Sequence, residues 1–334
     1  MGYIRSVCEE GTRIFIHKFH PMPTSRRQFM QQSLLASAAF VLPQWLPVSA
    51  TRKFTLSLSP GSVGIQGNMK SMIALAKKHG FEAITPFAEE LAAMSPGGRA
   101  EIRGLMESEG LTWDAAGIPV EFRQGKDRFL KDMMALPKVA AALAEVGATR
   151  MNTWIMPLHD SLTYLQNFNQ HRDRLRNASL VLQDHGIRFG LEYVGPQTLR
   201  YASRYVFIHS MKETRELIDA IGLPNVGLVL DSFHWFTANE TEADLLTLSD
   251  GDVVTCDLND GVAGRDYKSQ IDGERNLPLA SGVIDVKTFL GALVKIGYTG
   301  PVRAEPFNKA LNALENEEAA AATAKAMKAA FALI

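Results

Sequence analysis

The sequence is poor in cysteine, in net charge and in long apolar runs. Of its two cysteines, Cys8 lies near the start and only Cys256 lies in the part that we expect to fold, which excludes an intrachain disulfide there even in an oxidising compartment. A formal net charge of −1 provides no basic field to hold nucleic acid. The apolar run from Leu34 to Leu42 is far shorter than the ~20 residues that span a bilayer. We therefore expect neither a nucleic-acid partner nor a stable membrane span.

Residues 22–50 have the order of features of an export signal. Paired arginines in the string Ser-Arg-Arg-Gln-Phe-Met (25–30) precede the apolar run, and the small residues Val-Ser-Ala (48–50) follow it. A positive region, a short apolar region and a small-residue cleavage site in this order are typical of a secretory signal. The paired arginines resemble the twin-arginine signal, which is an address read by an export machinery and not an anchor. The alternative is a chance Arg-Arg pair before an apolar helix.

This signal predicts the domain organisation and the location. We expect residues 22–50 to be a twin-arginine (Tat) signal peptide, so that the protein acts in the periplasm or is otherwise exported. Residues 1–21 precede a second start at Met22 and are interpreted as an extension or a misassigned start. The remaining chain, residues 51–334, is near the ~250 residues typical of a (β/α)8 barrel.

Short apolar strands alternate with helical patterns along residues 51–334, and most of these helices end at a glycine, which is a stop signal. Eight strand-then-helix units predict a parallel sheet closed into a single-domain (β/α)8 TIM barrel. The alternative is a doubly wound open sheet, which usually carries G-x-G-x-x-G after its first strand, a spacing that residues 59–64 lack. The expected strands are 54–58, 81–85, 111–115, 149–154, 187–192, 226–230, 253–257 and 302–305, and the expected helices are 69–79, 96–109, 127–146, 161–185, 212–221, 242–248, 285–296 and 312–334.

Four acidic residues fall at the carboxyl ends of the last four strands: Glu192, Asp231, Asp257 and Glu305. That end of a barrel is its active face, and the alternation of side chains along a strand directs these acids into the barrel mouth. Converging carboxylates repel one another unless a cation neutralises them, and oxygen ligands suit Mg²⁺ or Mn²⁺. Each acid alone is also compatible with a helix N-cap or a solvated loop. Together they predict a divalent metal site.

Three stretches carry a resemblance to a known family: Gly-Leu-Glu (190–192), Gly-Leu-Val-Leu-Asp-Ser-Phe-His (227–234) and Gly-Tyr-Thr-Gly-Pro-Val-Arg-Ala-Glu-Pro (297–306). The chain resembles the xylose isomerase-like barrel superfamily, often labelled sugar phosphate isomerase/epimerase, over nearly all of residues 54–331. The resemblance implies a metal held by a Glu, an Asp, a His or Gln, and a final Glu, one from each of strands five to eight.

Glu192, Asp231 and Glu305 match three of these four places. At the fourth, relatives commonly show His-x-x-Asp or Gln-x-x-Asp, whereas this chain shows Asp257-Leu-Asn-Asp260. An all-carboxylate set favours Mn²⁺ or Mg²⁺ over Zn²⁺ or Co²⁺. Whether Asp257 binds the metal or only shapes the site stays open.

The resemblance also implies the chemistry. Glu192 and Glu305 would be the acid–base pair, moving a proton next to a carbonyl with a divalent metal to stabilise the charge. The predicted function is therefore a metal-dependent sugar isomerase or epimerase. The same site would serve a keto-sugar lyase or dehydratase, and the altered position Asp257 favours a non-catalytic carbohydrate-binding barrel. A DNA-repair endonuclease of this fold would need several histidines near strand ends and a basic face, which this chain lacks.

Four further residues are candidate substrate contacts. By resemblance His234, three residues after Asp231, contacts the substrate or orients a ligand, with a backbone-bonded histidine as the alternative. Arg275 lies in the long loop 260–284, and its planar donors suit substrate oxygens, although it is also compatible with a solvated loop position. His159 and Trp154 follow the fourth strand and are placed to line the mouth. An exported protein without a basic cluster at its strand ends is expected to act on an unphosphorylated sugar, keto-sugar or glycoside; its oligomeric state is not indicated.

Overall fold

The computed structural model describes residues 51–334, so the predicted export signal lies outside the described residues. All eight expected strands form, each within two residues of its predicted bounds. The strands are β1 (Thr55–Leu58), β2 (Ala83–Ile84), β3 (Thr112–Trp113), β4 (Ala116–Gly117), β5 (Arg150–Ile155), β6 (Leu158–His159), β7 (Arg188–Tyr193), β8 (Tyr205–Val206), β9 (Val226–Asp231), β10 (Val253–Asp257) and β11 (Pro301–Arg303).

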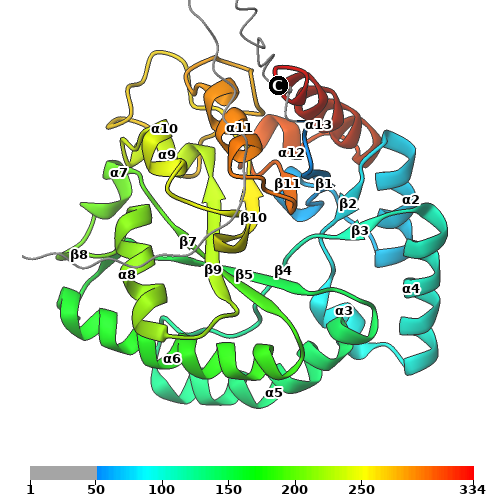
Figure 1. Ribbon diagram of the computed structural model, residues 1–334, viewed down its shortest axis with the longest axis horizontal. Helices are drawn as coiled ribbons and strands as arrows, with labels where there is room; N and C mark the ends of the chain where they lie inside the picture. The colour runs from blue at the N-terminus through cyan, green and yellow to red at the C-terminus, as the bar shows by residue number, and fades with distance from the viewer. Residues whose placement is uncertain (1–50) are drawn as a thin grey trace, which may run out of the picture. The chain divides into compact units, whose positions relative to one another are not determined.

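The eight expected helices also form and cover the outside of the sheet (Figure 1). The structure adds short helices that carry no long apolar periodicity. The helices are α2 (Met69–His79), α3 (Ala88–Ala93), α4 (Pro96–Glu109), α5 (Lys126–Glu145), α6 (Tyr164–Asp184), α7 (Gln197–Arg200), α8 (Met211–Ile221), α9 (Ser232–Thr237), α10 (Glu242–Leu245), α11 (Val286–Lys295), α12 (Lys309–Asn312) and α13 (Asn316–Phe331), with 3-10 turns at Gly61–Val63 and Asp250–Asp252. None of the helices in residues 51–334 combines the length and apolarity needed to cross a bilayer.

Capping residues explain why the predicted helix bounds hold. At the start of α2, the Asn68 side chain accepts from the Ser71 backbone N–H, and the Ser71 side chain accepts in return from the Asn68 N–H. The helix ends at Gly80, whose φ of 73° is left-handed and therefore suits glycine. Helix α4 repeats the scheme between Ser95, which caps its start, and Gly110 at φ 65°. Such caps satisfy backbone groups that a helix end would otherwise leave unpaired.

The parallel sheet closes on itself through one divided strand. Its order is β3-β2-β1-β11-β10-β9-β7-β5-β4, and β3 and β4 are two halves of the single segment 112–117. The first half pairs with β2 and the second half pairs with β5, all in parallel. The sheet is therefore a (β/α)8 barrel, and the alternative of an open, doubly wound sheet is wrong.

The inside of the barrel is tightly filled beneath its mouth. A Cβ atom at Gly190 would lie 2.8 Å from Val229 Cγ2 and 3.1 Å from Val254 Cβ, so only glycine fits this position of β7. Glu192, two residues on, shares the inward face by strand alternation. Phe189 and Leu191 point the other way and are fully buried. This is the orientation that the sequence predicted for β7.

Candidate active site

A cavity of about 450 Å³ opens at the carboxyl-terminal mouth of the barrel. It brings together five of the predicted site residues, which come from four different strand ends and from the long loop after β10. The lining residues are Asn152, Trp154, Met156, Glu192, Val194, Leu199, His234, Asp272, Arg275, Glu305 and Phe307. Asp231 and Asp257, which end β9 and β10, are both fully buried.

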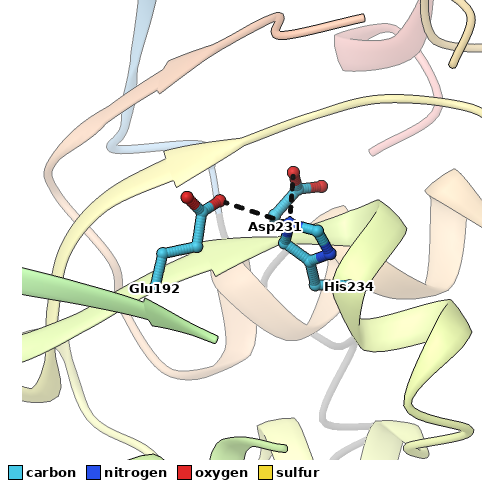
Figure 2. A group of neighbouring side chains, drawn as sticks. All are labelled: Glu192, Asp231 and His234. Atoms are coloured by element: carbon cyan, nitrogen blue, oxygen red, sulfur yellow. Dashed lines mark ion pairs between the residues drawn. The ribbon is translucent and has the colours of Figure 1, made fainter. Parts of the chain in front are cut away.

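Glu192, Asp231 and His234 form a compact group with one ligand atom from each within 4.8 Å of the others. Figure 2 shows His234 between the two carboxylates, with Nε2 at 3.8 Å from Glu192 Oε1 and 3.9 Å from Asp231 Oδ2. Asp231 ends β9 and caps α9, because its Oδ1 accepts from the Phe233 N–H at 2.6 Å. Because of this cap, α9 begins directly after the last residue of β9. His234 therefore lies on the first turn of α9, close to the strand ends.

Glu192 also belongs to a second group of possible metal ligands, with Asp257 and Glu305, again within 4.8 Å of one another. Its Oε1 is buried and has no hydrogen-bond partner among residues 51–334. Burial, followed by the charge of Glu305, raises the pKa of Glu192 well above its ordinary value. Burial and then Asp257 raise the pKa of Glu305 to about 8. The site therefore concentrates negative charge that is only partly compensated.

Arg275 supplies part of the missing positive charge. Its Nη1 donates to Asp231 Oδ2 at 2.7 Å and lies 3.6 Å from Glu305 Oε2. Its Nη2 donates to Asp272 Oδ1 at 2.7 Å and lies 3.2 Å from His234 Nε2. Burial, followed by the positive charge of Arg275, lowers the pKa of His234 to about 3, so the imidazole is neutral. Arg275 is placed in the cavity as predicted, but these donors are directed at protein groups.

A second arginine, Arg303, binds Asp257, the acid that stands where the resemblance implies a His or Gln ligand. Its Nε and Nη2 donate to the two oxygens of Asp257 at 2.7 and 3.2 Å, and its Nη1 lies 3.8 Å from Asp114 Oδ1. Asp114 in turn accepts from the hydroxyls of Ser57 and Thr255 at 2.7 Å each. Sequence reasoning missed Arg303, although it lies two residues before Glu305 in the last strand and therefore shares its face.

The residues present fit a divalent cation. Two groups of three ligands share Glu192, whose unpartnered buried oxygen is the kind of atom that a cation satisfies. Asp231 and Asp257 already accept hydrogen bonds on both oxygens, from Asn259 and Arg275 and from Arg303. Carboxylates with one imidazole support a divalent metal without selecting which one.

The two remaining candidates lie to one side of the mouth. Trp154 lines the cavity and is 42% exposed. His159 lines a neighbouring cavity instead, at the antiparallel pair β6–β8, where it lies opposite Tyr205. This pair could not be predicted from the sequence, because each of its strands has two residues.

A closed parallel barrel with buried acids and a histidine at its carboxyl-terminal mouth defines a TIM barrel with a candidate metal site. The chain belongs to the family described as Xylose isomerase-like TIM barrel, whose profile matches residues 73–330. The structure of a xylose isomerase domain protein from Alicyclobacillus acidocaldarius subsp. acidocaldarius is similar at a TM-score of 0.74 and 30% identity, over 84% of this chain and 99% of that one.

Two further similarities extend the comparison. A crystal structure of IolI protein with a bound zinc atom has a TM-score of 0.70 at 20% identity, over 84% of this chain and 98% of that one, which shows the fold alone. Inosose isomerase from Bacillus subtilis (strain 168) is 30% identical over 148 residues, which are 44% of this chain and 50% of that protein. The chain thus spans about half the length of this curated relative.

Proposed function

We propose that the protein is a divalent-metal-dependent sugar isomerase or epimerase that transfers a proton next to a carbonyl of an unphosphorylated sugar. The observation that carries this proposal is the pair Glu192 and Glu305. Both carboxylates line one cavity at the barrel mouth, within 4.8 Å of each other, and both have raised pKa values. Acid–base groups that work near neutral pH are tuned in this way.

The two carboxylates divide the proton transfer between them. The ionised carboxylate takes the proton from the carbon next to the carbonyl, and the electron pair of that C–H bond forms the double bond of an enediolate. The protonated partner then returns a proton to the opposite face of the same carbon, which inverts it, or to the neighbouring carbon. In the second case the hydroxyl proton also moves to the former carbonyl oxygen, and the sugar is isomerised. A divalent cation, when bound by Glu192 with Asp231 and His234, or by Glu192 with Asp257 and Glu305, would stabilise the negative oxygen.

The names of similar proteins support this chemistry. Inosose isomerases are among the relatives in sequence, and a D-psicose 3-epimerase from Clostridium cellulolyticum H10 shares the fold at a TM-score of 0.63 and 15% identity, over 83% of this chain and 98% of that one. The charges of the cavity support an unphosphorylated substrate. Arg275 is the cation among the residues that line the cavity, and Asp231 and Asp272 already pair with it. A location outside the cytoplasm, as the sequence predicts, is consistent with this choice.

The test is a proton-exchange assay on purified protein. Inososes and free ketoses are incubated in D₂O with the protein, and NMR follows the loss of the signal of the hydrogen next to the carbonyl. We expect exchange that stops with EDTA and returns with Mn²⁺ or Mg²⁺. Exchange at full rate in metal-free protein would refute the role of the metal. Binding of a sugar without exchange would refute the proposal that the protein catalyses proton transfer.

A non-catalytic carbohydrate-binding barrel is the second candidate. It is favoured by the pairing of Asp257 with Arg303, which engages both oxygens of that carboxylate. The exchange assay separates the two candidates directly. A keto-sugar lyase would also exchange the proton, but it would in addition release a dehydrated product that absorbs ultraviolet light.

A further inference from the structure

A second cavity of about 350 Å³ lies beside the mouth cavity, and Trp154 and Met156 line both. Its volume falls within the ~300–1,000 Å³ of small-molecule sites. It has its own polar lining, which the proton transfer does not use. The other residues that line it are Glu121, Arg123, Gln124, Leu158, His159, Asn167 and His171.

Three polar atoms of this lining are buried without a hydrogen-bond partner in residues 51–334: Asn167 Oδ1, His171 Nε2 and Arg123 Nε. The Asn167 and His171 side chains come from neighbouring turns of α6 and are 1% and 2% exposed. A buried polar group without a partner is costly, so unpaired groups gathered around one cavity point to a ligand that pairs with them.

The hydrogen-bonding character of these atoms can be assigned from their surroundings. His171 Nδ1 lies 2.9 Å from the Asn167 carbonyl oxygen, so Nδ1 carries the proton and Nε2 is an acceptor. Burial lowers the pKa of His171 to about 4, which keeps the ring neutral. His159 Nδ1 accepts from the N–H groups of Ser161 and Leu162, which leaves its Nε2–H as a donor. The residues that line the cavity thus carry two unpaired acceptors, Asn167 Oδ1 and His171 Nε2, together with the donors His159 Nε2 and Arg123 Nε.

The charge of the cavity is balanced and its wall is fixed. The Arg123 guanidinium lies between the rings of Phe122 and Trp154, at 4.3 and 4.1 Å from their centroids. Its Nη2 donates to Thr153 Oγ1 at 2.9 Å and to the Trp154 carbonyl oxygen at 2.6 Å. Glu121 Oε1, 3.3 Å from Nη1, compensates the charge. A neutral ligand with hydroxyl groups fits this set, because each hydroxyl both donates and accepts.

We propose that this second cavity is a subsite for a second sugar ring, so that the substrate is a glycoside or disaccharide that spans both cavities. The reacting ring lies in the mouth cavity, against Glu192 and Glu305. The second ring lies on the other side of Trp154, in the second cavity, and forms hydrogen bonds with Asn167, His171 and Arg123. The identity of the reacting ring rests on the proposed function. The presence of the second subsite is tested by binding alone.

The experiment compares the binding of one-ring and two-ring sugars by isothermal titration calorimetry. D-Glucose and methyl glucosides are titrated into the purified protein alongside maltose, cellobiose and trehalose. We expect at least one disaccharide to bind ten times or more tightly than the one-ring sugars. The variants Asn167→Leu and His171→Phe should lose this advantage and keep the affinity for the one-ring sugars. Asn177→Leu, at an exposed position of the same helix, is the matched control and should retain it.

Thermal unfolding distinguishes a binding role from a structural one. Replacing an unpartnered acceptor by an apolar group of similar size should leave the Tm of both variants unchanged or higher. A lower Tm with equal loss of affinity for both sugar classes would overturn the subsite, as would the absence of any disaccharide advantage or its survival in both variants. If the protein does not catalyse proton exchange but still binds a disaccharide more tightly than the one-ring sugars, the proposed function is refuted and the second subsite is supported.

Discussion

Replacement of Glu305 by glutamine should remove activity and stabilise the metal-free protein at neutral to alkaline pH. Burial and the charge of Asp257 raise the pKa of Glu305 from 4.5 to about 8, so the folded state keeps a proton that the unfolded state has lost. The stability contributed by this group is complete below pH 4.5 and is lost as the pH rises through about 8. Glutamine does not ionise, and the variant should escape this loss.

The size of the effect follows from the pKa difference. At about 1.4 kcal/mol per pKa unit, a shift from 4.5 to about 8 sets an upper limit of about 5 kcal/mol at pH 8. The side chain is 20% exposed and its titration is linked to that of Glu192, so we expect a gain of about 1–3 kcal/mol. Activity should fall at least ~10²-fold, because the variant lacks one of the two proton-transfer groups.

The assay is urea unfolding in EDTA at pH 4.5 and pH 8, for the wild type and Glu305→Gln. The two proteins should have equal unfolding free energies at pH 4.5 and should diverge by pH 8 in favour of the variant. Glu318→Gln, at an exposed position of α13, is the control and should show no such divergence. If the variant is less stable than the wild type at pH 8, the raised pKa of Glu305 is refuted. If it keeps wild-type turnover, the catalytic role of Glu305 is refuted.

Three further predictions concern other charges of the barrel. Arg303→Met should destabilise the fold by about 3–5 kcal/mol, because it leaves the buried charge of Asp257 uncompensated. Urea unfolding should show this loss, and the double variant with Asp257→Asn should recover part of the stability. Mn²⁺ or Mg²⁺ should raise the Tm of EDTA-treated protein more at pH 8 than at pH 5, since the ligands must ionise; an equal shift at both would contradict this. Burial raises the pKa of Glu240 to about 7, so wild-type stability should fall between about pH 4.5 and 7, and Glu240→Gln should flatten that fall by about 1–3 kcal/mol in thermal unfolding.

The barrel could be predicted from the sequence because its signals are local and repeated. Capping residues and glycine stops fix helices such as α2 and α4 at the predicted residues. The division of one segment between two neighbouring strands could not be predicted, because β3 and β4 are two residues each, which is too short for a pattern of alternating side chains. The β6–β8 pair was missed for the same reason, and with it the wall on which His159 lies.

The site was predictable where one residue type repeats at one structural position. Acids at successive strand ends identified Glu192 and Glu305, which the structure places in one cavity. Asn167 and His171 gave no such signal, because a polar residue on an amphipathic helix is ordinarily solvated, and only the fold shows that they are buried. Arg303 was missed because an arginine inside a strand is informative only once its partner, Asp257, is known.

The pairing of Asp257 with Arg303 compensates the acid that this chain carries where the resemblance implies a His or Gln ligand. A lone aspartate there would add a buried negative charge beside Glu192 and Glu305. Arg303 donates to both oxygens of Asp257, so the pair as a whole is as neutral as the residue it replaces. Because both of its oxygens accept from Arg303, Asp257 is a weaker metal ligand than a free carboxylate. Glu192 Oε1 has no hydrogen-bond partner among the described residues, so metal affinity should depend chiefly on Glu192.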